Sequence, residues 1–147
     1  MTTKTKSCLA AAWIALALLS GSSAVQARTA DTAALITQAE QQWKVGQLDE
    51  AQKTFKAALA AEPDAVDIAL KIAGLQLSNN DFAACIPTYQ HVIGLDANNV
   101  RAWLGLGFAY LHTGKNSLSM AAFSEAIRID PTKKDALQPM LAKLQTP

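Results

Sequence analysis

The sequence has few of the residues that catalytic and metal sites need. It contains two cysteines, Cys8 and Cys85, and two histidines, His91 and His112, among 147 residues. A zinc site needs His, Cys or carboxylate side chains clustered at helical or turn spacing, and neither histidine has such neighbours. The seven glycines form no phosphate-binding loop. We therefore expect a protein with no catalytic residues, no metal and no cofactor, and not an enzyme.

One pair of these residues deserves separate consideration. Cys85 and His91 could act as nucleophile and base, but a spacing of six places them on opposed faces of a helix, since each residue turns by about 100°. We expect Cys85 to be a small buried core residue. We expect His112 to be an exposed residue at a helix end. A narrower hypothesis is that His112 tunes partner binding between mildly acidic and neutral pH.

Long apolar runs and an excess of charge are also missing. The apolar run Cys8–Leu19 has only 12 residues, whereas a membrane-spanning helix needs about 20. Charged residues make up 17% of the chain and the net charge is +1. Such a surface exerts no long-range attraction on nucleic acid or anionic lipid.

The first 27 residues have the layout of a secretory signal peptide. Lys4 and Lys6 precede the apolar run, a Ser/Gly segment ends it, and Val25–Ala27 places small residues where a signal peptidase cleaves. We predict cleavage after Ala27 and a periplasmic or secreted protein, with an uncleaved anchor as the alternative. A lipoprotein is disfavoured because its cysteine would follow the apolar run, and Cys8 stands at the start of it.

Beyond the signal segment, the sequence repeats every 34 residues. Segments 32–65, 66–99 and 100–133 align without gaps. Repeats of 20 to 50 residues indicate a solenoid or a related array. The aligned columns are Leu35/Ala69/Trp103, Ala39/Ala73/Gly107, Gly46/Asn80/Gly114, Ala51/Cys85/Ser119, Phe55/Tyr89/Phe123, Ala58/Val92/Ala126 and Pro63/Ala97/Pro131.

Each column has a physical role in a pair of helices. Small residues let the two helices approach, and large aromatic residues fill the space before the next pair. Gly or Asn suits the left-handed turn after the first helix, and Pro ends the second helix. After a short N-terminal segment, 28–31, we expect helices near 33–45, 49–61, 66–78, 82–95, 100–113, 117–129 and 133–145. Pro87 should lie within about the first turn of its helix, and Pro139 should kink or loosen the last one.

This pattern resembles the tetratricopeptide repeat (TPR). The third unit matches the family pattern at Trp103, Leu106, Gly107, Tyr110, Gly114, Phe123, Ala126 and Pro131. The first unit departs from it at Gln38 and Gln42, and the second at Asn80, Cys85 and Ala97. The resemblance implies an all-α fold, a TPR-type α-solenoid of three helix-turn-helix repeats with a C-terminal capping helix within 134–147. Such a cap shields the final unit from solvent.

The resemblance also implies a concave face lined by the first helix of each pair. On these first helices, the positions that belong to no packing column should face the groove. They include Lys44, Asp67, Gly74 and Gly105. Apolar residues form two rows at 34-residue spacing, the first with Ile36, Leu70 and Leu104 and the second with Trp43, Leu77 and Leu111. The residues that we predict to bind a partner are Ile36, Glu40, Trp43, Leu70, Lys71, Leu77, Arg101, Leu104, Phe108, Leu111 and His112.

An exposed apolar groove usually marks a binding site, and this one suits an amphipathic helix or an apolar peptide. Two alternatives remain open: the cap or residues 28–32 fold back and bury the rows, or the chain self-associates through them. Family members that hold chaperone C-termini share a two-carboxylate clamp. That clamp is absent here, because its positions hold Ile36, Glu40, Lys71, Arg101 and Gly105.

We therefore expect the partner to be another protein or a peptide segment, with no nucleic acid and no membrane span after signal cleavage. The leading hypothesis is an interaction adaptor or scaffold of the cell envelope. The alternatives are a periplasmic holdase-type chaperone and a self-associating structural protein, possible as a homo-oligomer. An adaptor should have one stoichiometric partner, whereas a holdase should have many weak ones.

Overall fold

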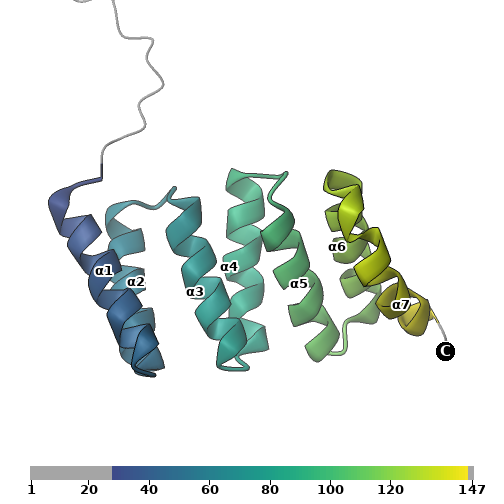
Figure 1. Ribbon diagram of the computed structural model, residues 1–147, viewed down its shortest axis with the longest axis horizontal. Helices are drawn as coiled ribbons and strands as arrows, with labels where there is room; N and C mark the ends of the chain where they lie inside the picture. The colour runs from purple at the N-terminus through teal and green to yellow at the C-terminus, as the bar shows by residue number, and fades with distance from the viewer. Residues whose placement is uncertain (1–27, 146–147) are drawn as a thin grey trace, which may run out of the picture.

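Seven α-helices follow one another in the part of the chain that the computed structural model describes, residues 28–145 (Figure 1). Their ranges lie within three residues of those predicted, and those of α3 and α4 coincide with the prediction. The predicted signal peptide and its cleavage site lie outside the described residues. The helices are α1 (Ala30–Lys44), α2 (Leu48–Ala61), α3 (Val66–Ser78), α4 (Phe82–Leu95), α5 (Val100–His112), α6 (Asn116–Ile129) and α7 (Lys134–Gln145), the last preceded by a 3₁₀ turn, Pro131–Lys133.

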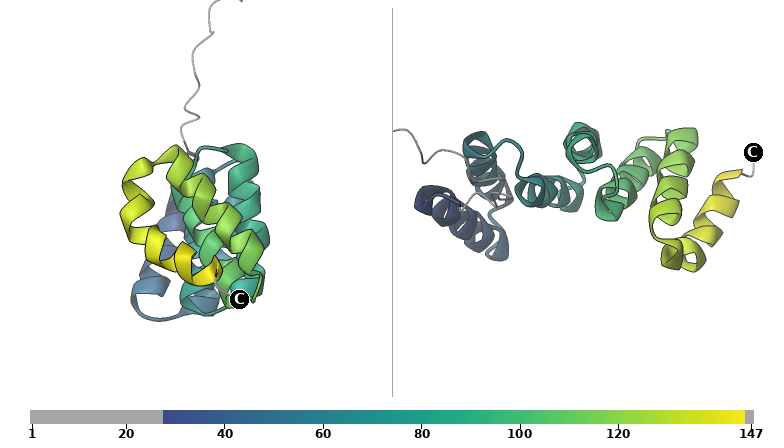
Figure 2. Two further views of the ribbon diagram at one scale, coloured as in Figure 1. Left: turned by 90° about the vertical axis from the view of Figure 1, so that its right-hand side faces the viewer. Right: turned by 90° about the horizontal axis from the view of Figure 1, so that it is seen from above.

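The helices form a single row of pairs in which each helix packs on its neighbours in the sequence. Seen from above, α1, α3, α5 and α7 lie on the side that faces the viewer in Figure 1, with α2, α4 and α6 behind them (Figure 2). This arrangement is the predicted solenoid. It presents the first helix of every pair on one continuous face.

The turn within each pair is made as the repeat predicts. Gly46, Asn80 and Gly114 all have positive φ angles, of 78°, 58° and 72°. After each of them the chain closes the same hydrogen bond, from the backbone N–H of the next residue to the carbonyl five residues earlier, as between Gln47 and Gln42 at 2.9 Å. This is the Schellman ending of a helix, which requires a left-handed residue and therefore favours Gly or Asn.

The small-residue columns are buried where the two helices of a pair cross. Cys85 and Ser119 are both completely buried. The Ser119 hydroxyl donates a hydrogen bond of 2.8 Å to the carbonyl oxygen of Gly107 on the facing helix. A Cβ atom at Gly107 would lie only 2.5 Å from Cε1 of Phe123, so a larger residue would force the helices apart. The predicted roles of these columns are confirmed.

Three core clusters run along the row. The first joins α1, α2 and α3 around Phe55 and Ile72, and the second extends from α3 to α6 around Tyr89 and Leu106. The third joins α6 and α7 through Phe123, Ala126 and Leu137. The aromatic column thus fills the space between successive pairs, and α7 covers the last aromatic residue, which is the role of a cap.

Two departures from the family pattern have a structural explanation. Gln42 accepts a hydrogen bond of 2.8 Å from the Thr54 hydroxyl, and Gln76, which is 34 residues further on, accepts one of 2.9 Å from Thr88. Both glutamines therefore link the two helices of their pair. Gln38 is exposed on α1, the first helix of the described residues. The polar residues in the first unit suit a unit that ends the array.

The two prolines inside helices do not end them. Pro87 is the sixth residue of α4, so it lies one turn deeper than the predicted first turn. Its ring nitrogen cannot donate to the Ala83 carbonyl, but both residues are exposed, so water can hydrate that carbonyl. Pro139 is likewise exposed, and α7 continues through it to Gln145.

Candidate binding groove

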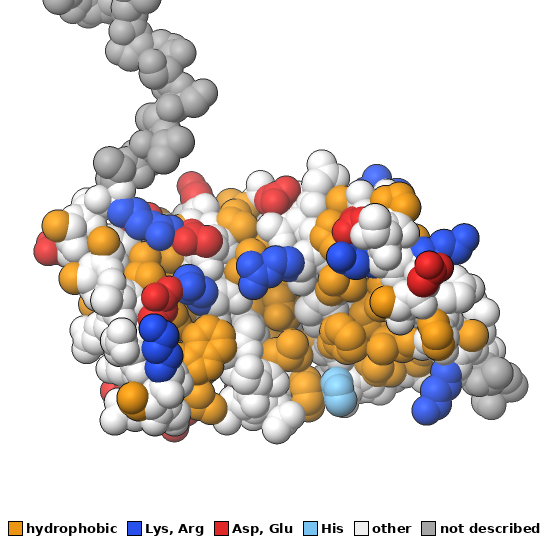
Figure 3. Space-filling model, in the orientation of Figure 1, with side chains coloured by type: hydrophobic (Ala, Val, Ile, Leu, Met, Phe, Trp, Pro, Cys, Tyr) orange, Lys and Arg blue, Asp and Glu red, His pale blue; other side chains and the backbone are white. Residues whose placement is uncertain are grey.

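The face made by α1, α3, α5 and α7 carries a broad apolar surface. Hydrophobic side chains gather on it from the middle of α3 to α7 (Figure 3). Six of the apolar residues that we predicted to bind a partner are half-buried and thus partly accessible. They are Trp43, Leu70, Leu77, Leu104, Phe108 and Leu111. We call the surface that these six side chains line on α1, α3 and α5 the groove.

One predicted groove residue belongs to the core. Ile36 is only 8% exposed and packs in the cluster that α1 forms with α2 and α3. Its counterparts at 34-residue spacing, Leu70 and Leu104, are half-buried. The first apolar row therefore offers a partner two side chains instead of the three that we predicted.

An ion pair crosses the groove between α1 and α3. The Nζ atom of Lys71 lies 2.6 Å from Oε1 of Glu40. The hydrogen bond from Lys71 lowers the pKa of the Glu40 carboxyl, and the charge of Lys44 contributes in the same direction. Both side chains of the pair are about one third exposed, so water screens much of the attraction. The pair closes this part of the groove with polar atoms.

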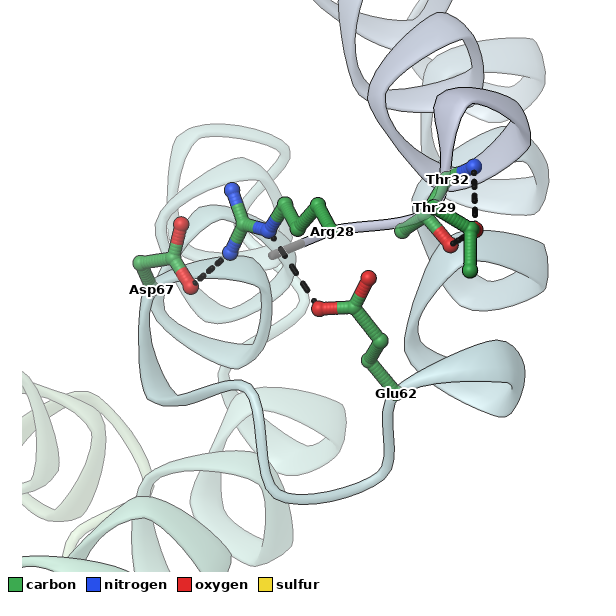
Figure 4. Close-up of polar contacts among 5 residues, drawn as sticks. All are labelled: Arg28, Thr29, Thr32, Glu62 and Asp67. Carbon is green, nitrogen blue, oxygen red and sulfur yellow. Dashed lines mark hydrogen bonds and ion pairs between the residues drawn. The ribbon is translucent and has the colours of Figure 1, made fainter. Parts of the chain in front are cut away.

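A second set of ion pairs lies at the N-terminal end of the same face. Arg28 places Nη2 at 2.5 Å from Oδ1 of Asp67 on α3 and Nε at 3.3 Å from Oε2 of Glu62 at the end of α2 (Figure 4). The hydrogen bond from Arg28 lowers the pKa of Asp67. Thr29 caps α1 by accepting a hydrogen bond from the backbone N–H of Thr32. Residues 28–32 thus begin α1 and reach the α2–α3 junction.

The equivalent positions between α3 and α5 are glycines. Gly74 and Gly105 occupy the repeat positions of Glu40 and Lys71. A Cβ atom at Gly105 would lie 2.1 Å from Cζ of Tyr89. Gly105 is therefore a buried packing position against the Tyr89 ring, and its predicted place among the groove-facing residues is corrected accordingly.

Gly74 has a different environment. A Cβ atom there would meet only Cη2 of Trp43, at an ordinary contact distance of 3.8 Å. The Trp43 indole packs edge-on against the Phe55 ring, with centroids 6.3 Å apart. The indole therefore extends from the core of the first pair to the α3 backbone at Gly74 and forms one wall of the groove.

The C-terminal part of the groove is bordered by the cap. The Phe108 ring packs edge-on against Phe123, with centroids 5.2 Å apart. Leu104 and Phe108 pack on the same cluster as Met140 and Leu141 of α7. However, α7 packs mainly on α6, and both Leu104 and Phe108 remain half-buried. The cap thus extends the apolar face and does not fold back over it.

The remaining polar groove residues are basic. Arg101 and Lys44 are exposed, and neither forms an ion pair with a carboxylate in residues 28–145. His112 is exposed and stacks on Phe82 of α4, with centroids 4.2 Å apart and an interplanar angle of 6°. The two groove carboxylates, Glu40 and Asp67, are both ion-paired, so the charges left open to a partner are positive.

The residues considered for chemistry lie apart from the groove. Cys85 is completely buried, its burial raises the pKa of the thiol to about 11, and its Sγ donates to the Phe82 carbonyl at 3.3 Å. The prediction of a buried core cysteine is confirmed. The Nε2 atom of His91 lies 3.1 Å from the carbonyl oxygen of Pro63. In the described part of the chain, no three His, Cys, Asp or Glu side chains are grouped to hold a metal ion.

Two contributors to this face were missed from the sequence. Arg28 was read as part of a short N-terminal segment, and no repeat spacing marks it because it precedes the first unit. Tyr89 was assigned only to a packing column. A signal for Tyr89 existed at Gly105, because glycine is unfavourable inside a helix by about 1 kcal/mol relative to alanine and its presence there indicates close packing of a neighbour.

No helix in residues 28–145 is both long and apolar enough to cross a membrane. Comparison with solved structures gives the fold independently. The Yersinia enterocolitica type III secretion chaperone SycD, in complex with a peptide of the translocator YopD, superposes with a TM-score of 0.71 at 18% identity, covering 80% of this chain and 95% of that one. The first TPR of Spaghetti (RPAP3), bound to the HSP90 peptide SRMEEVD, superposes with a TM-score of 0.69 at 18% identity, covering 77% and 89%.

Sequence comparison points to the same repeats. A probable UDP-N-acetylglucosamine–peptide N-acetylglucosaminyltransferase, SPINDLY of Arabidopsis thaliana, is 35% identical over 68 residues. The match covers 46% of this chain but only 7% of that relative. The sequence model described as "Tetratricopeptide repeat" matches residues 36–90 and 70–134, which together make up more than half of the chain. With its three registered helix pairs, the chain belongs to the tetratricopeptide repeat family.

Proposed function

We propose that the protein is an interaction adaptor or scaffold of the cell envelope that binds a peptide or helix of another protein in the groove, without catalysis. One observation carries this proposal. Leu70 and Leu77 on α3, and Leu104, Phe108 and Leu111 on α5, stay half-buried on a single face. Side chains of this kind gain free energy when a partner removes the rest of their surface from water, at about 25 cal/mol per Å².

The structural relatives support a peptide-binding role. Two of them were solved with peptides bound, one from a translocator and one from HSP90. At 18% identity they share the fold with this chain, and fold alone does not specify a partner. The envelope assignment is supported by the signal-like segment before Arg28, which is a feature of the sequence.

Two other functions use the same surface. A holdase would cover apolar segments of many clients, and a structural protein would pair the groove with a second copy. End-to-end stacking of copies is the least favoured form of self-association. Gln38 and Gln41 on α1 and Gln138 on α7 are exposed, so both ends of the array carry polar side chains.

The proposal is tested by capturing tagged protein from its native envelope and identifying what is bound. The groove variant is Leu77→Glu with Phe108→Glu. The matched control is Val45→Glu with Leu118→Glu, since these two apolar residues are 69% and 49% exposed outside the groove. Far-UV circular dichroism first confirms that both variants fold.

One stoichiometric partner that is lost in the groove variant and kept in the control supports an adaptor. A broad set of apolar clients with the same dependence indicates a holdase, and capture of the untagged chain alone indicates self-association. A partner that still binds the groove variant contradicts the proposed binding surface.

A further inference from the structure

The space between α3 and α5 differs from the space between α1 and α3 at two equivalent positions. Glu40 and Lys71 bridge the first space with an ion pair of 2.6 Å. Gly74 and Gly105 stand at the same repeat positions in the second space and put no side chain into it. The groove is therefore closed by polar atoms on one side of α3. On the other side the Tyr89 ring takes the place of a side chain at Gly105, and the position at Gly74 is left open.

The two glycines do not have the same structural justification. Gly105 accommodates the Tyr89 ring, since a Cβ atom there would lie 2.1 Å from Cζ. Gly74 has no positive φ angle and no close neighbour, because a Cβ atom would be 3.8 Å from Trp43. Glycine in a helix costs about 1 kcal/mol relative to alanine, and packing within this chain does not account for that cost at Gly74. The absent side chain leaves room on the groove surface.

Apolar and aromatic side chains flank Gly74, and the Ser78 hydroxyl donates a hydrogen bond to its carbonyl. Leu70 and Leu77 lie one turn before and after it on the same face of α3. Trp43 forms a wall on the α1 side. Leu104 lies on α5 and is half-buried, with its packing contacts on the α6–α7 cluster. A large apolar side chain of a partner would be enclosed here by aliphatic and aromatic groups, which is the usual character of an anchor pocket.

The open charges favour an acidic partner. Glu40 and Asp67 are neutralised by Lys71 and Arg28. Arg101 forms no ion pair among the described residues, and Lys44 forms none either, although its charge also acts on Glu40. Arg101 also lies in the first turn of α5, where the helix dipole disfavours a cation. The first turns of α1, α2, α3 and α7 carry acidic residues instead. An acidic side chain of a partner would relieve this unfavourable placement.

The backbone of the groove favours a helical partner over an extended one. An extended segment leaves its N–H and C=O groups to be satisfied by the surface that it contacts. The walls of the groove are helices whose backbone groups bond internally, and the Gly74 carbonyl accepts a further hydrogen bond of 2.9 Å from the Ser78 hydroxyl. A helix satisfies its own backbone and can present apolar anchors at spacings of three, four and seven residues.

We infer that the groove takes an acidic amphipathic helix of a partner protein, which seats one large apolar side chain over Gly74 between α3 and α5 and turns a carboxylate toward Arg101. This inference rests on the proposed function and specifies the partner's chemistry. The occupant is defined by charge complementarity and by the room at Gly74.

The test begins with peptide selection on residues 28–147, the chain that contains all seven helices. A display library of random peptides of about 18 residues, enough for five helical turns, is selected against the immobilised chain. Enriched peptides are synthesised, and their dissociation constants are measured by fluorescence anisotropy against four variants: Gly74→Ala, Gly74→Leu, Arg101→Gln, and Leu77→Glu with Phe108→Glu.

The enriched peptides should be net negative, with apolar residues at helical spacing. Gly74→Leu should weaken binding by about tenfold or more, because it fills the anchor site. Gly74→Ala adds a single methyl group and should change affinity by no more than about threefold. Arg101→Gln should weaken binding at low salt by about threefold to tenfold and much less near 1 M salt, where the Debye length is about 3 Å. Arg101→Gln supplies this readout even if Gly74→Leu fails to fold.

The outcomes separate this inference from the function on which it rests. Peptides that lose binding to the Leu77→Glu/Phe108→Glu variant but are neutral or basic, and that tolerate Gly74→Leu and Arg101→Gln, overturn the inference and leave the groove as a binding site. If no enriched peptide depends on Leu77 and Phe108, the proposed function itself fails.

Discussion

The ammonium group of Lys71 lies 2.6 Å from Oε1 of Glu40, and this ion pair ties α1 to α3 across the concave face. The two helices that follow, α3 and α5, meet at the same repeat positions with Gly74 and Gly105. A repeat that conserves its packing columns can thus vary its groove positions from one unit to the next. In this chain the variation leaves the room for a partner beside α3.

Gly107, which is buried in the third pair, should not tolerate a methyl group. Gly107→Ala would place Cβ at 2.5 Å from Phe123 Cε1. Overpacking of this kind costs about 1–3 kcal/mol, and the better helix propensity of alanine returns about 1 kcal/mol. We expect a lower midpoint in urea unfolding for Gly107→Ala. Gly74→Ala is the matched control and should raise the midpoint. Equal shifts of the same sign would contradict the assigned packing.

The thiol of Cys85 should be unreactive in the folded protein. The side chain is fully buried, and burial raises its pKa to about 11, whereas only the thiolate is a nucleophile. We expect no reaction with a thiol-specific disulfide reagent near pH 8 without denaturant, and one equivalent of thiol in urea. Rapid reaction of the folded chain would show that Cys85 lies on an accessible surface.

Stability should decrease at acid pH in a way that depends on two carboxylates. Lys71 lowers the pKa of Glu40, and Arg28 lowers that of Asp67. Folding is therefore favoured above the ordinary carboxyl pKa values near 4, and this contribution is lost as the pH falls through the lower folded values. Because both side chains are partly exposed, the contribution is small.

The measurement is the melting temperature between pH 2 and pH 7 in low salt. Glu40→Gln with Asp67→Asn should flatten the acid side of the curve. The Asp49→Asn variant is a control, since Asp49 forms no ion pair among the described residues. If the double variant keeps the slope of the parent chain, these ion pairs do not contribute to the acid sensitivity.

The capping helix should stabilise the array through one leucine in particular. Leu137 is 5% exposed and packs with Phe123 and Ala126 of α6. Leu137→Ala should lower the free energy of unfolding by about 2–4 kcal/mol, as truncation of a buried leucine does. Leu118→Ala is the matched control, because Leu118 is 49% exposed on α6, and it should cost far less. Similar losses for both would mean that α7 does not cover the third repeat.

Most of the fold could be predicted because each column of aligned residues meets one structural requirement of a helix pair. The turn residues, such as Asn80, and the small buried residues, such as Cys85, follow from backbone geometry and from the close approach of two helices. These requirements are local to one pair, so a single sequence with three copies of the pair displays them three times.

The groove was predicted less completely, because alignment identifies equivalent positions without saying what covers them. Ile36 is equivalent to Leu70 yet lies in the core of the first cluster. Gly105 is equivalent to Lys71 yet lies beneath the Tyr89 ring. In both cases the side chain that covers the position comes from another helix, and its reach depends on packing that the repeat pattern does not encode.

The proposed function requires that a partner protein occupies the groove beside α5, and site-specific photo-crosslinking tests this occupancy. A photoreactive amino acid replaces Leu104 in the groove or, as a control, Lys56, which is exposed on α2 outside the groove. Both proteins are expressed in the native envelope and irradiated. We expect a discrete covalent adduct with one partner from position 104 and none from position 56. An adduct from position 56 with none from position 104 would contradict it.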